Sequence, residues 1–279
     1  MTRPHIIIIA TETDISAKLI KEAAEKVADT DFYYYQELAA SSLPTITLKN
    51  HTPESILIAR QPYTANQVEQ NYVPYLAALL EKYKFKKVLD GKLYEHAFVQ
   101  YEDKYYHNYL FEKFKMPYAP FADIHKPETI EYPIIAKKRL SSRAESNFIL
   151  KSSEELQRFI FANDVTQFIF QKFYDLAADY RVLILNNQLV GVARRKIVIK
   201  YGYRATVQVD SVGSVPQEIV DQCCQLTKHL GCDLCGFDVG ETKDGSLFFI
   251  EYNTSPQFMG YQRETGKDLA LEIVQSLVS

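Results

Sequence analysis

Two apolar runs near the end of the chain flank the dipeptide Asp244-Gly245, and this arrangement restricts the fold more than any other feature. Residues 234–241 and 246–253 both have the composition of β-strands, and Asp-Gly is a favoured two-residue hairpin turn. If the dipeptide is the turn, Asp238 lies directly opposite Glu251. Their side chains then share one face of the hairpin, with Cβ atoms about 5 Å apart.

A pair of carboxylates held side by side among apolar neighbours requires compensation. The two groups repel each other unless one is protonated or a cation joins them. Asn253 projects to the same face as Glu251, because strand side chains alternate. Oxygen ligands of this kind suit Mg²⁺, which completes its shell with water and phosphate. A second interpretation stays open, in which the acids lie at an exposed strand end and solvent screens them.

Length and charge bound the other possibilities. A chain of 279 residues with 47% apolar content can bury the core of two or three small lobes. The net charge of -3 gives no reason to expect nucleic acid or an anionic membrane as a partner. Residues 1–14 lack the length and cleavage site of a signal peptide, and no apolar run could cross a bilayer, so a cytoplasmic protein is expected.

The four cysteines resemble a zinc cluster only superficially. Cys232 and Cys235 have the C-x-x-C spacing. Cys223 and Cys224, however, are neighbours on a predicted helix, so their side chains diverge by about 100°. We therefore predict buried thiols.

The first third of the chain has the alternation of an open α/β sheet. Residues 6–10 form an apolar run typical of a strand buried on both faces. Further strands are predicted near 32–35, 56–59 and 87–90, with helices over 15–27 and 68–83. The G-x-G-x-x-G fingerprint is absent from this stretch of sequence, which argues against a dinucleotide domain.

A second lobe is predicted after a helix that starts at Asp103 and stops before Met116-Pro117. Strands are expected at 134–138, 148–151 and 168–173, with a helix over 153–162. Asn186-Asn187 predicts a hairpin between 181–185 and 188–195, because asparagine tolerates positive φ. A helix over 217–230 leads to the carboxylate hairpin.

The C-terminal residues resemble those of a known superfamily. The runs Gly236-Phe-Asp238, then Phe249-Ile-Glu251-Tyr-Asn253-Thr-Ser255-Pro256, then Glu264-Thr-Gly266-Lys-Asp268-Leu-Ala270 are similar in order and spacing to the signature of ATP-grasp enzymes, specifically the RimK-type glutamate ligases. The resemblance covers the chain from about Asp103 to the end.

The resemblance implies an α/β (α+β) architecture, the ATP-grasp fold, with three lobes and ATP held between two antiparallel sheets. Residues 1–100 would be an N-terminal open α/β domain. Residues 101–279 would be the ATP-grasp domain, with a central lobe over about 101–173 and a C-terminal lobe over about 174–279.

Residue roles follow by resemblance at matching positions. For the nucleotide, it implies that the phosphates are bound by Lys104 and Lys137, the adenine by the backbone of Gln171, Lys172 and Phe173, and the ribose by Asp179. For the reaction, it implies that Arg194 and Arg204 steady the transferred phosphate and the acyl-phosphate oxygens. Asp238, Glu251 and Asn253 would hold Mg²⁺. The usual glycine-rich loop is replaced by residues 139–147, where Ser141, Ser142 and Arg143 offer side-chain donors instead.

The expected function is an ATP-dependent carboxylate–amine ligase that forms a carbon–nitrogen bond through an acyl phosphate, using ATP and Mg²⁺ or Mn²⁺. The expected acceptor is an amino acid, a peptide or a protein, and the resemblance also implies a homo-oligomer. Two alternatives remain: a catalytically silent ATP-binding regulatory module, which the glycine-free loop favours, and an ATP-grasp kinase.

Overall fold

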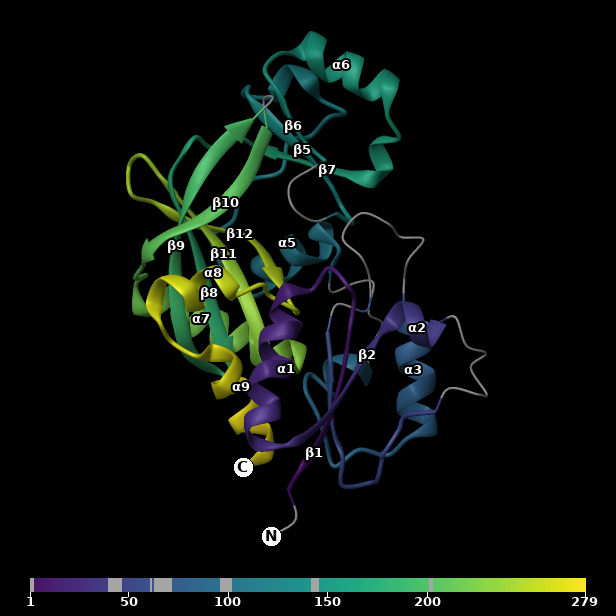
Figure 1. Cartoon of the computed structure of the whole chain (residues 1–279). Helices are drawn as coiled ribbons and strands as arrows, with labels where there is room; N and C mark the ends of the chain where they lie inside the picture. Colours follow the sequence, from purple (N-terminus) through teal and green to yellow (C-terminus); the bar gives the residue numbers. More distant parts are fainter. Residues whose placement is uncertain are drawn as a thin grey trace.

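The computed structural model describes residues 3–39, 47–60, 62, 72–95, 102–141, 146–200 and 203–279, and the side chains of 196–200 and 203–212 are not among those described. The described strands form three sheets, of four, three and five strands. Figure 1 shows the three-stranded sheet at one end of the molecule, and the four- and five-stranded sheets on either side of helix α1 (Ile15–Val27).

The four-stranded sheet is parallel, in the order β2-β1-β3-β4, as the alternating pattern predicts. Its strands are β1 (His5–Ala10), β2 (Asp29–Tyr34), β3 (Ile56–Ala59) and β4 (Lys87–Val88). Ile6 and Ile8 pack in one cluster with residues of α1, whereas Ile7 and Ile9 pack in another with α2 (Tyr35–Ala39) and α3 (Val73–Lys82). Alternate side chains of β1 therefore fill opposite faces, which explains its unbroken apolar run.

The three-stranded sheet is antiparallel, in the order β6-β5-β7, and has its own core. Its strands are β5 (Ile134–Lys138), β6 (Asn147–Leu150) and β7 (Phe168–Lys172), and helix α6 (Ser153–Ala162) covers it. Strand β5 and helix α6 have the bounds that the sequence predicts. This small core is separate from the other clusters.

The five-stranded sheet is antiparallel, in the order β10-β9-β8-β11-β12. The strands are β8 (Leu176–Leu185), β9 (Gln188–Lys200), β10 (Tyr203–Val212), β11 (Leu234–Thr242) and β12 (Leu247–Asn253). Asn186 and Asn187 have φ of 50° and 60°, so the predicted two-residue turn is confirmed. Helix α7 (Gln217–Leu230) covers one face through Cys223, Leu226 and Leu230.

Helix α5 (Lys104–Lys113) packs against the five-stranded sheet. Leu110 and Phe111 lie in the same cluster as Phe249 and Tyr252 of β12. The core of the five-stranded layer therefore includes this helix.

Two C-terminal helices that the sequence analysis did not predict, α8 (Met259–Thr265) and α9 (Leu269–Val278), join the N-terminal and C-terminal parts. Ile273 and Val274 of α9 share one core with Ile20 and Ala23 of α1 and with Leu183 of β8. The N-terminal sheet is consequently fixed to the five-stranded sheet by a continuous apolar core.

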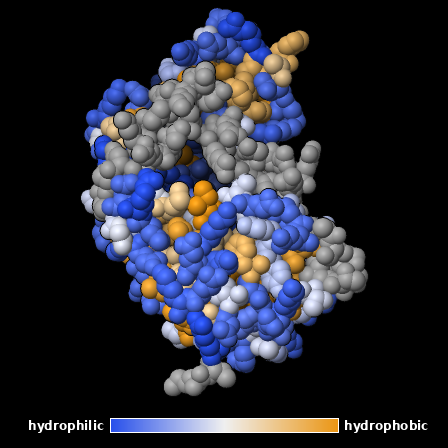
Figure 2. All heavy atoms as spheres, viewed as in Figure 1, coloured by the Kyte–Doolittle hydropathy of each residue, from blue (hydrophilic) through white to orange (hydrophobic). Residues whose placement is uncertain are grey.

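Within the described residues, no helix has the length and apolar character needed to span a bilayer. The face in Figure 2 is largely hydrophilic among the residues that are coloured.

Candidate active site

Asp238 and Glu251 are directly opposite each other on β11 and β12, as the sequence predicts. The turn that produces this register differs from the prediction. The amide of Thr242 donates to the carbonyl of Ser246 at 2.9 Å, which leaves a three-residue loop with Gly245 at φ 84°. A loop of this length pairs residues whose numbers sum to one less than predicted.

A β-bulge restores the predicted pair. Val239 lies opposite Phe249, but the next pair is Asp238 and Glu251, so Ile250 is an extra residue in β12. Without this bulge Asp238 would face Ile250, and Glu251 would project from the other face of the sheet. The local irregularity therefore brings the two carboxylates together.

Two arginines hold the Asp238 carboxylate. Arg181 on β8 donates to both of its oxygens, at 2.9 and 3.0 Å, and Nη2 of Arg195 on β9 lies 2.9 Å from Oδ2. Burial alone would raise the pKa of Asp238, but the charges of Arg181 and Arg195 hold it well below its usual range. The carboxylate is thus ionised and fixed in place.

Arg195 lies beside Asp238, whereas the predicted residue Arg194 does not. Asp179 pairs with Arg195 and Tyr180 with Arg194, so Arg194 projects from the opposite face, beside Tyr180. A bulge at Val190 causes the difference, since an unbroken hairpin from the Asn186-Asn187 turn would pair Asp179 with Arg194. The side chain of Arg204, the other predicted catalytic arginine, lies outside the part of the chain that is described.

Asp179, which the resemblance places beside the ribose, lies within the sheet. Its side chain is fully buried and forms an ion pair with Arg195, which in turn contacts Asp238. The side chains of Asp179, Arg181, Arg195 and Asp238 therefore form one network of ion pairs, in which Asp179 holds Arg195 beside Asp238.

Lys104 reaches the carboxylate pair from helix α5. Its Nζ is 3.7 Å from a carboxylate oxygen of Glu251 and donates to the carbonyl of Ser141 at 2.7 Å. Asp103 caps the helix by accepting the amide of Tyr105 at 2.8 Å. The lysine is thereby held, nearly buried, between the helix and the segment that follows β5. Ser142 and Arg143 lie outside the described residues.

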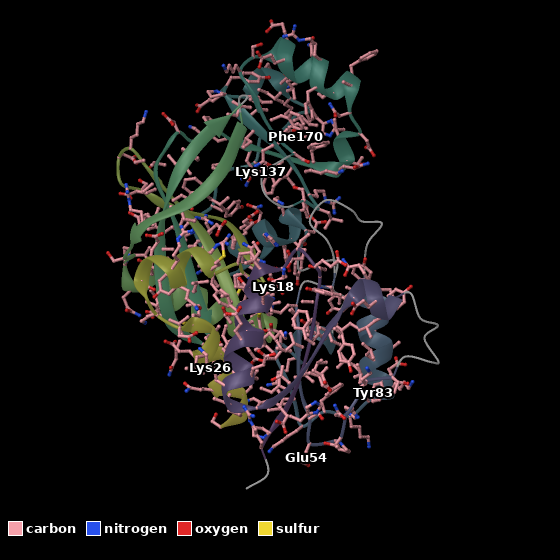
Figure 3. The ribbon with its side chains drawn as sticks, viewed as in Figure 1. Lys18, Lys26, Glu54, Tyr83, Lys137 and Phe170 are labelled. Carbon is pink, nitrogen blue, oxygen red and sulfur yellow. The ribbon has the colours of Figure 1, made fainter. Side chains whose placement is uncertain are left out.

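Lys137 is connected to α5 through a buried amide. Its Nζ donates to Gln171 at 3.0 Å, Gln171 donates to Asn108 at 2.8 Å, and Asn108 donates to the carbonyl of Lys104 at 2.7 Å. Figure 3 shows Lys137 on the side of the three-stranded sheet that is nearer to the rest of the molecule. The side chain of Gln171 therefore connects Lys137 to the helix that carries Lys104.

The segment predicted to contact adenine is held by its backbone. The amide of Lys172 donates to the carbonyl of Pro120 at 2.9 Å and that of Phe173 to the carbonyl of Pro133 at 3.1 Å. Both N–H groups therefore have partners within the protein. The ammonium of Lys172 pairs with Glu131 at 3.0 Å on the surface.

Three of the four cysteines are buried thiols, as predicted. Cys223, Cys232 and Cys235 lie in the core beside α7, whereas Cys224 is half-buried. In the part of the chain that the structure describes, no group of three or more His, Cys, Asp and Glu side chains could hold a metal ion.

The donor set at the hairpin suits a single hard cation. Asp238 already accepts three hydrogen bonds, and because a carboxylate offers about four acceptor positions, about one remains. Glu251 keeps a 27% exposed side chain. The Nδ2 atom of Asn253 is buried without a hydrogen-bond partner among the described residues. Since oxygen and nitrogen of an amide exchange by rotation, this group can present its oxygen to a cation.

These features define a class of protein. A three-stranded and a five-stranded antiparallel sheet, with the carboxylate pair on the five-stranded sheet and Lys104 beside it, are the features of the ATP-grasp fold. The solved ATP-grasp ligase PsnB, complexed with minimal precursor, Mg and ADP, superimposes with a TM-score of 0.71 at 15% identity, covering 100% of this chain and 98% of PsnB. The model of the RimK-like ATP-grasp domain matches residues 120–277, more than half of the chain, and the chain belongs to this family.

Curated relatives match the same region. Beta-citrylglutamate synthase B of Homo sapiens is 23% identical over 153 residues, which cover 53% of this chain and 39% of the relative. Coenzyme gamma-F420-2:alpha-L-glutamate ligase of Methanocaldococcus jannaschii is 26% identical over 160 residues, 53% of each protein. The chain thus matches between about two fifths and about half of the length of these relatives.

Proposed function

We propose that the chain is an ATP-dependent carboxylate–amine ligase, which forms an amide or peptide bond through an acyl phosphate. The carrying observation is the cluster of cations on the carboxylate pair. Arg181 and Arg195 contact Asp238 at 2.9 Å, and Lys104 lies 3.7 Å from Glu251. Such a set suits phosphoryl transfer, in which catalysis consists mainly of positioning and charge neutralisation.

The proposed reaction needs no nucleophilic side chain. An oxygen of the substrate carboxylate attacks the γ-phosphorus, and the bond to the leaving ADP oxygen breaks. The amine then attacks the acyl carbon, phosphate leaves with the bonding electrons, and the amine loses a proton. Lys104 and Lys137 would bind phosphate oxygens. Bound Mg²⁺, held by Asp238, Glu251 and Asn253, would supply charge neutralisation at the same oxygens.

The names of the relatives support the substrate class. Two are a beta-citrylglutamate synthase and a glutamate ligase, and PsnB has also been solved with a precursor peptide. We propose an amino acid, a peptide or a protein terminus as the amine acceptor. We also propose that Mn²⁺ can replace Mg²⁺, since both prefer oxygen ligands, and that the protein works in the cytoplasm, where its four free thiols stay reduced. As domains we propose residues 1–100 and 101–279.

Trapping of the acyl phosphate tests the proposal. ADP release is measured with ATP, Mg²⁺ and pooled amino acids and short peptides, and hydroxylamine converts an acyl phosphate into a hydroxamate. Glu251→Gln is compared with Glu54→Gln, whose 80% exposed side chain lies at the far end of the N-terminal lobe (Figure 3). We expect substrate-dependent ADP and hydroxamate in the wild type and in Glu54→Gln, and neither in Glu251→Gln.

Other outcomes separate the alternatives. Phosphorylation of an acceptor without hydroxamate would indicate a kinase. Magnesium-dependent nucleotide binding without turnover on any acceptor would indicate a regulatory module. Either result would contradict ligase chemistry.

A further inference from the structure

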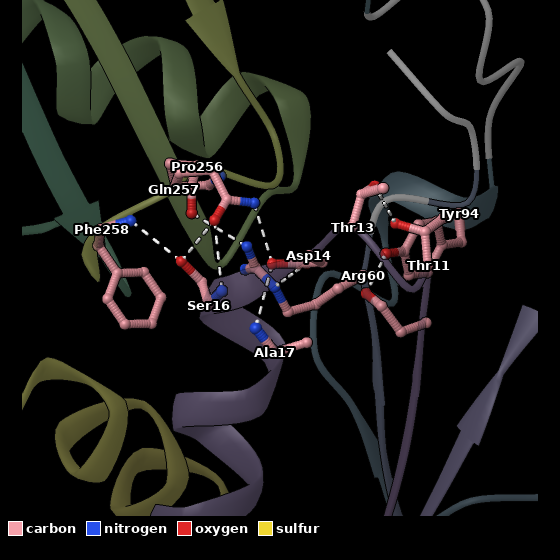
Figure 4. A network of polar contacts seen from close by, with 11 residues as sticks. Thr11, Thr13, Asp14, Ser16, Ala17, Arg60, Tyr94, Pro256, Gln257 and Phe258 are labelled. Carbon is pink, nitrogen blue, oxygen red and sulfur yellow. Dashed lines mark hydrogen bonds and ion pairs between the residues drawn. The ribbon is translucent and has the colours of Figure 1, made fainter. Parts of the chain in front are cut away.

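A fully buried ion pair lies where the N-terminal lobe meets the loop that follows Asn253. Asp14 caps helix α1, and Arg60 directly follows β3, so both stand at the carboxyl ends of parallel strands. Nε of Arg60 donates to Asp14 at 2.8 Å, and the two side chains are 1% and 0% exposed (Figure 4). A buried pair of this kind requires further hydrogen bonds to offset its desolvation.

The further partners come from residues 256–258. Nη2 of Arg60 donates to the carbonyl of Pro256 at 3.0 Å, and the side-chain amide of Gln257 donates to Asp14 at 2.9 Å. The hydroxyl of Ser16 donates to the Gln257 side chain at 2.9 Å, and the amide of Phe258 donates to the same hydroxyl at 3.1 Å. The loop after the carboxylate hairpin is therefore bound by side chains of the N-terminal lobe.

Arg181 continues this network to the carboxylate pair. Its Nη1 donates to the carbonyl of Gln257 at 3.3 Å, while its Nε and Nη2 hold Asp238. The successive carbonyls of Pro256 and Gln257 thus accept from one arginine of each lobe. Gln257 is also only four residues beyond Asn253, so a shift of the loop would move the end of β12 together with Arg181.

We propose that Asp14, Arg60 and Gln257 form an interlobe clamp, a set of positioning residues that fixes Asp238 and Asn253 in the geometry required to bind Mg²⁺ with a nucleotide. This inference rests on the proposed function, because it concerns the same metal site. None of the three side chains touches the carboxylate of Glu251 or the lysines. The clamp acts through Arg181 and through the path of the chain, and it makes magnesium affinity depend on docking of the N-terminal lobe.

A matched control distinguishes positioning of the metal site from the general effect of a contact between the lobes. Lys26 of α1 forms an ion pair with Asp268 at the start of α9, at 3.3 Å, and these side chains are 59% and 38% exposed. Figure 3 shows Lys26 toward the far end of α1 from the clamp. Lys26→Ala therefore removes a contact between the same two parts of the molecule without touching residues 256–258.

The experiment measures ADP binding to the full chain by titration calorimetry, once in EDTA and once in excess Mg²⁺. The ratio of the two dissociation constants is the magnesium-dependent gain. We expect Gln257→Ala to reduce this gain about tenfold, the effect of losing one hydrogen bond to a charged group, with the affinity in EDTA unchanged. Ser16→Ala, a milder change to the same network, should reduce the gain less, and Lys26→Ala should leave both constants unchanged.

Three results would overturn the inference. A full magnesium gain in Gln257→Ala would show that the loop needs no clamp. An equal loss of affinity with and without Mg²⁺ would indicate a merely structural role. If Glu251→Gln also keeps the magnesium-dependent gain, the proposed metal site is wrong and the clamp is wrong with it. If Glu251→Gln loses the gain but Gln257→Ala keeps it, only the clamp is wrong.

Discussion

Asp238→Asn leaves two nearly buried arginines with one carboxylate between them. In the wild type, Arg181 and Arg195 share Asp238, and Arg195 also pairs with Asp179. Removal of one partner from a buried ion pair costs about 3–5 kcal/mol, because a charge stays buried without compensation. At about 2–4 °C per kcal/mol for a chain of roughly this size, the midpoint of thermal unfolding should fall by roughly 6–20 °C.

Glu251→Gln provides the comparison within the same proposed metal site. The Glu251 side chain is 27% exposed, and its nearest cation is the Lys104 ammonium at 3.7 Å. A partly exposed pair at this distance contributes about 1 kcal/mol or less to stability. Both substitutions should abolish ligase turnover, but only Asp238→Asn should strongly destabilise the fold.

Urea unfolding followed by far-ultraviolet circular dichroism measures this difference, since the chain contains no tryptophan. The pKa of Asp238 is lowered by folding, so its stabilising contribution is present above the ordinary carboxyl pKa of about 3.9 and is lost as the pH falls below it. The difference in the free energy of unfolding between the wild type and Asp238→Asn should therefore be largest at pH 7 and smaller in acid. Equal stability losses for the two variants at pH 7 would refute the charge cluster.

Three further substitutions test two other residues of the site and one buried carboxylate outside it, Asp90, which accepts the amides of Asp233 and Leu234. Arg195→Lys should lower turnover about tenfold or more, because an ammonium lacks the planar fork with which Arg195 contacts Asp179 and Asp238 together. Arg194→Lys on the opposite face should change turnover little, and steady-state kinetics that rank the two variants in reverse would contradict the register. Lys137→Ala should weaken ADP binding in calorimetry by about tenfold, the loss of one charged hydrogen bond, with Lys138→Ala as the control. Asp90→Asn should remove a pH dependence of the free energy of unfolding. Burial raises the pKa of Asp90 to about 7. Its stabilising contribution is therefore present below about pH 4 and disappears as the pH rises to about 7. A wild-type unfolding free energy that stays level across that range would exclude this assignment.

Much of the architecture was predictable because its signals are local. The apolar run of β1, the Asn186-Asn187 turn and the helix over 217–230 depend on side-chain period and turn chemistry, which neighbouring residues fix. Strand β10 and the helices α8 and α9 were not predicted. Helix α9 lies in a core shared with α1, whose residues are about 250 positions away in sequence.

The two arginines at positions 194 and 195 show where sequence reasoning stops. The predicted hairpin turn is correct, yet the extra residue Val190 shifts the register by one and exchanges the face of both side chains. The opposite case occurs in β12. The longer turn shifts the register by one residue, and the extra residue Ile250 shifts it back, so that Asp238 and Glu251 pair as predicted but for a different reason. Bulges of this kind depend on packing across the sheet, and the strand pattern carries no mark of them.

The sequence by itself determined the family and the placement of Asp238, Glu251 and Asn253 on one hairpin, because the order and spacing of these motifs are properties of short segments. Tertiary structure alone decided which cations meet those carboxylates. Arg181 and Arg195 reach Asp238 from neighbouring strands, and Arg60 reaches the following loop from another lobe. Such contacts are set by register and by the docking of separate layers, and the free energy that selects them comes from burial summed over the whole core.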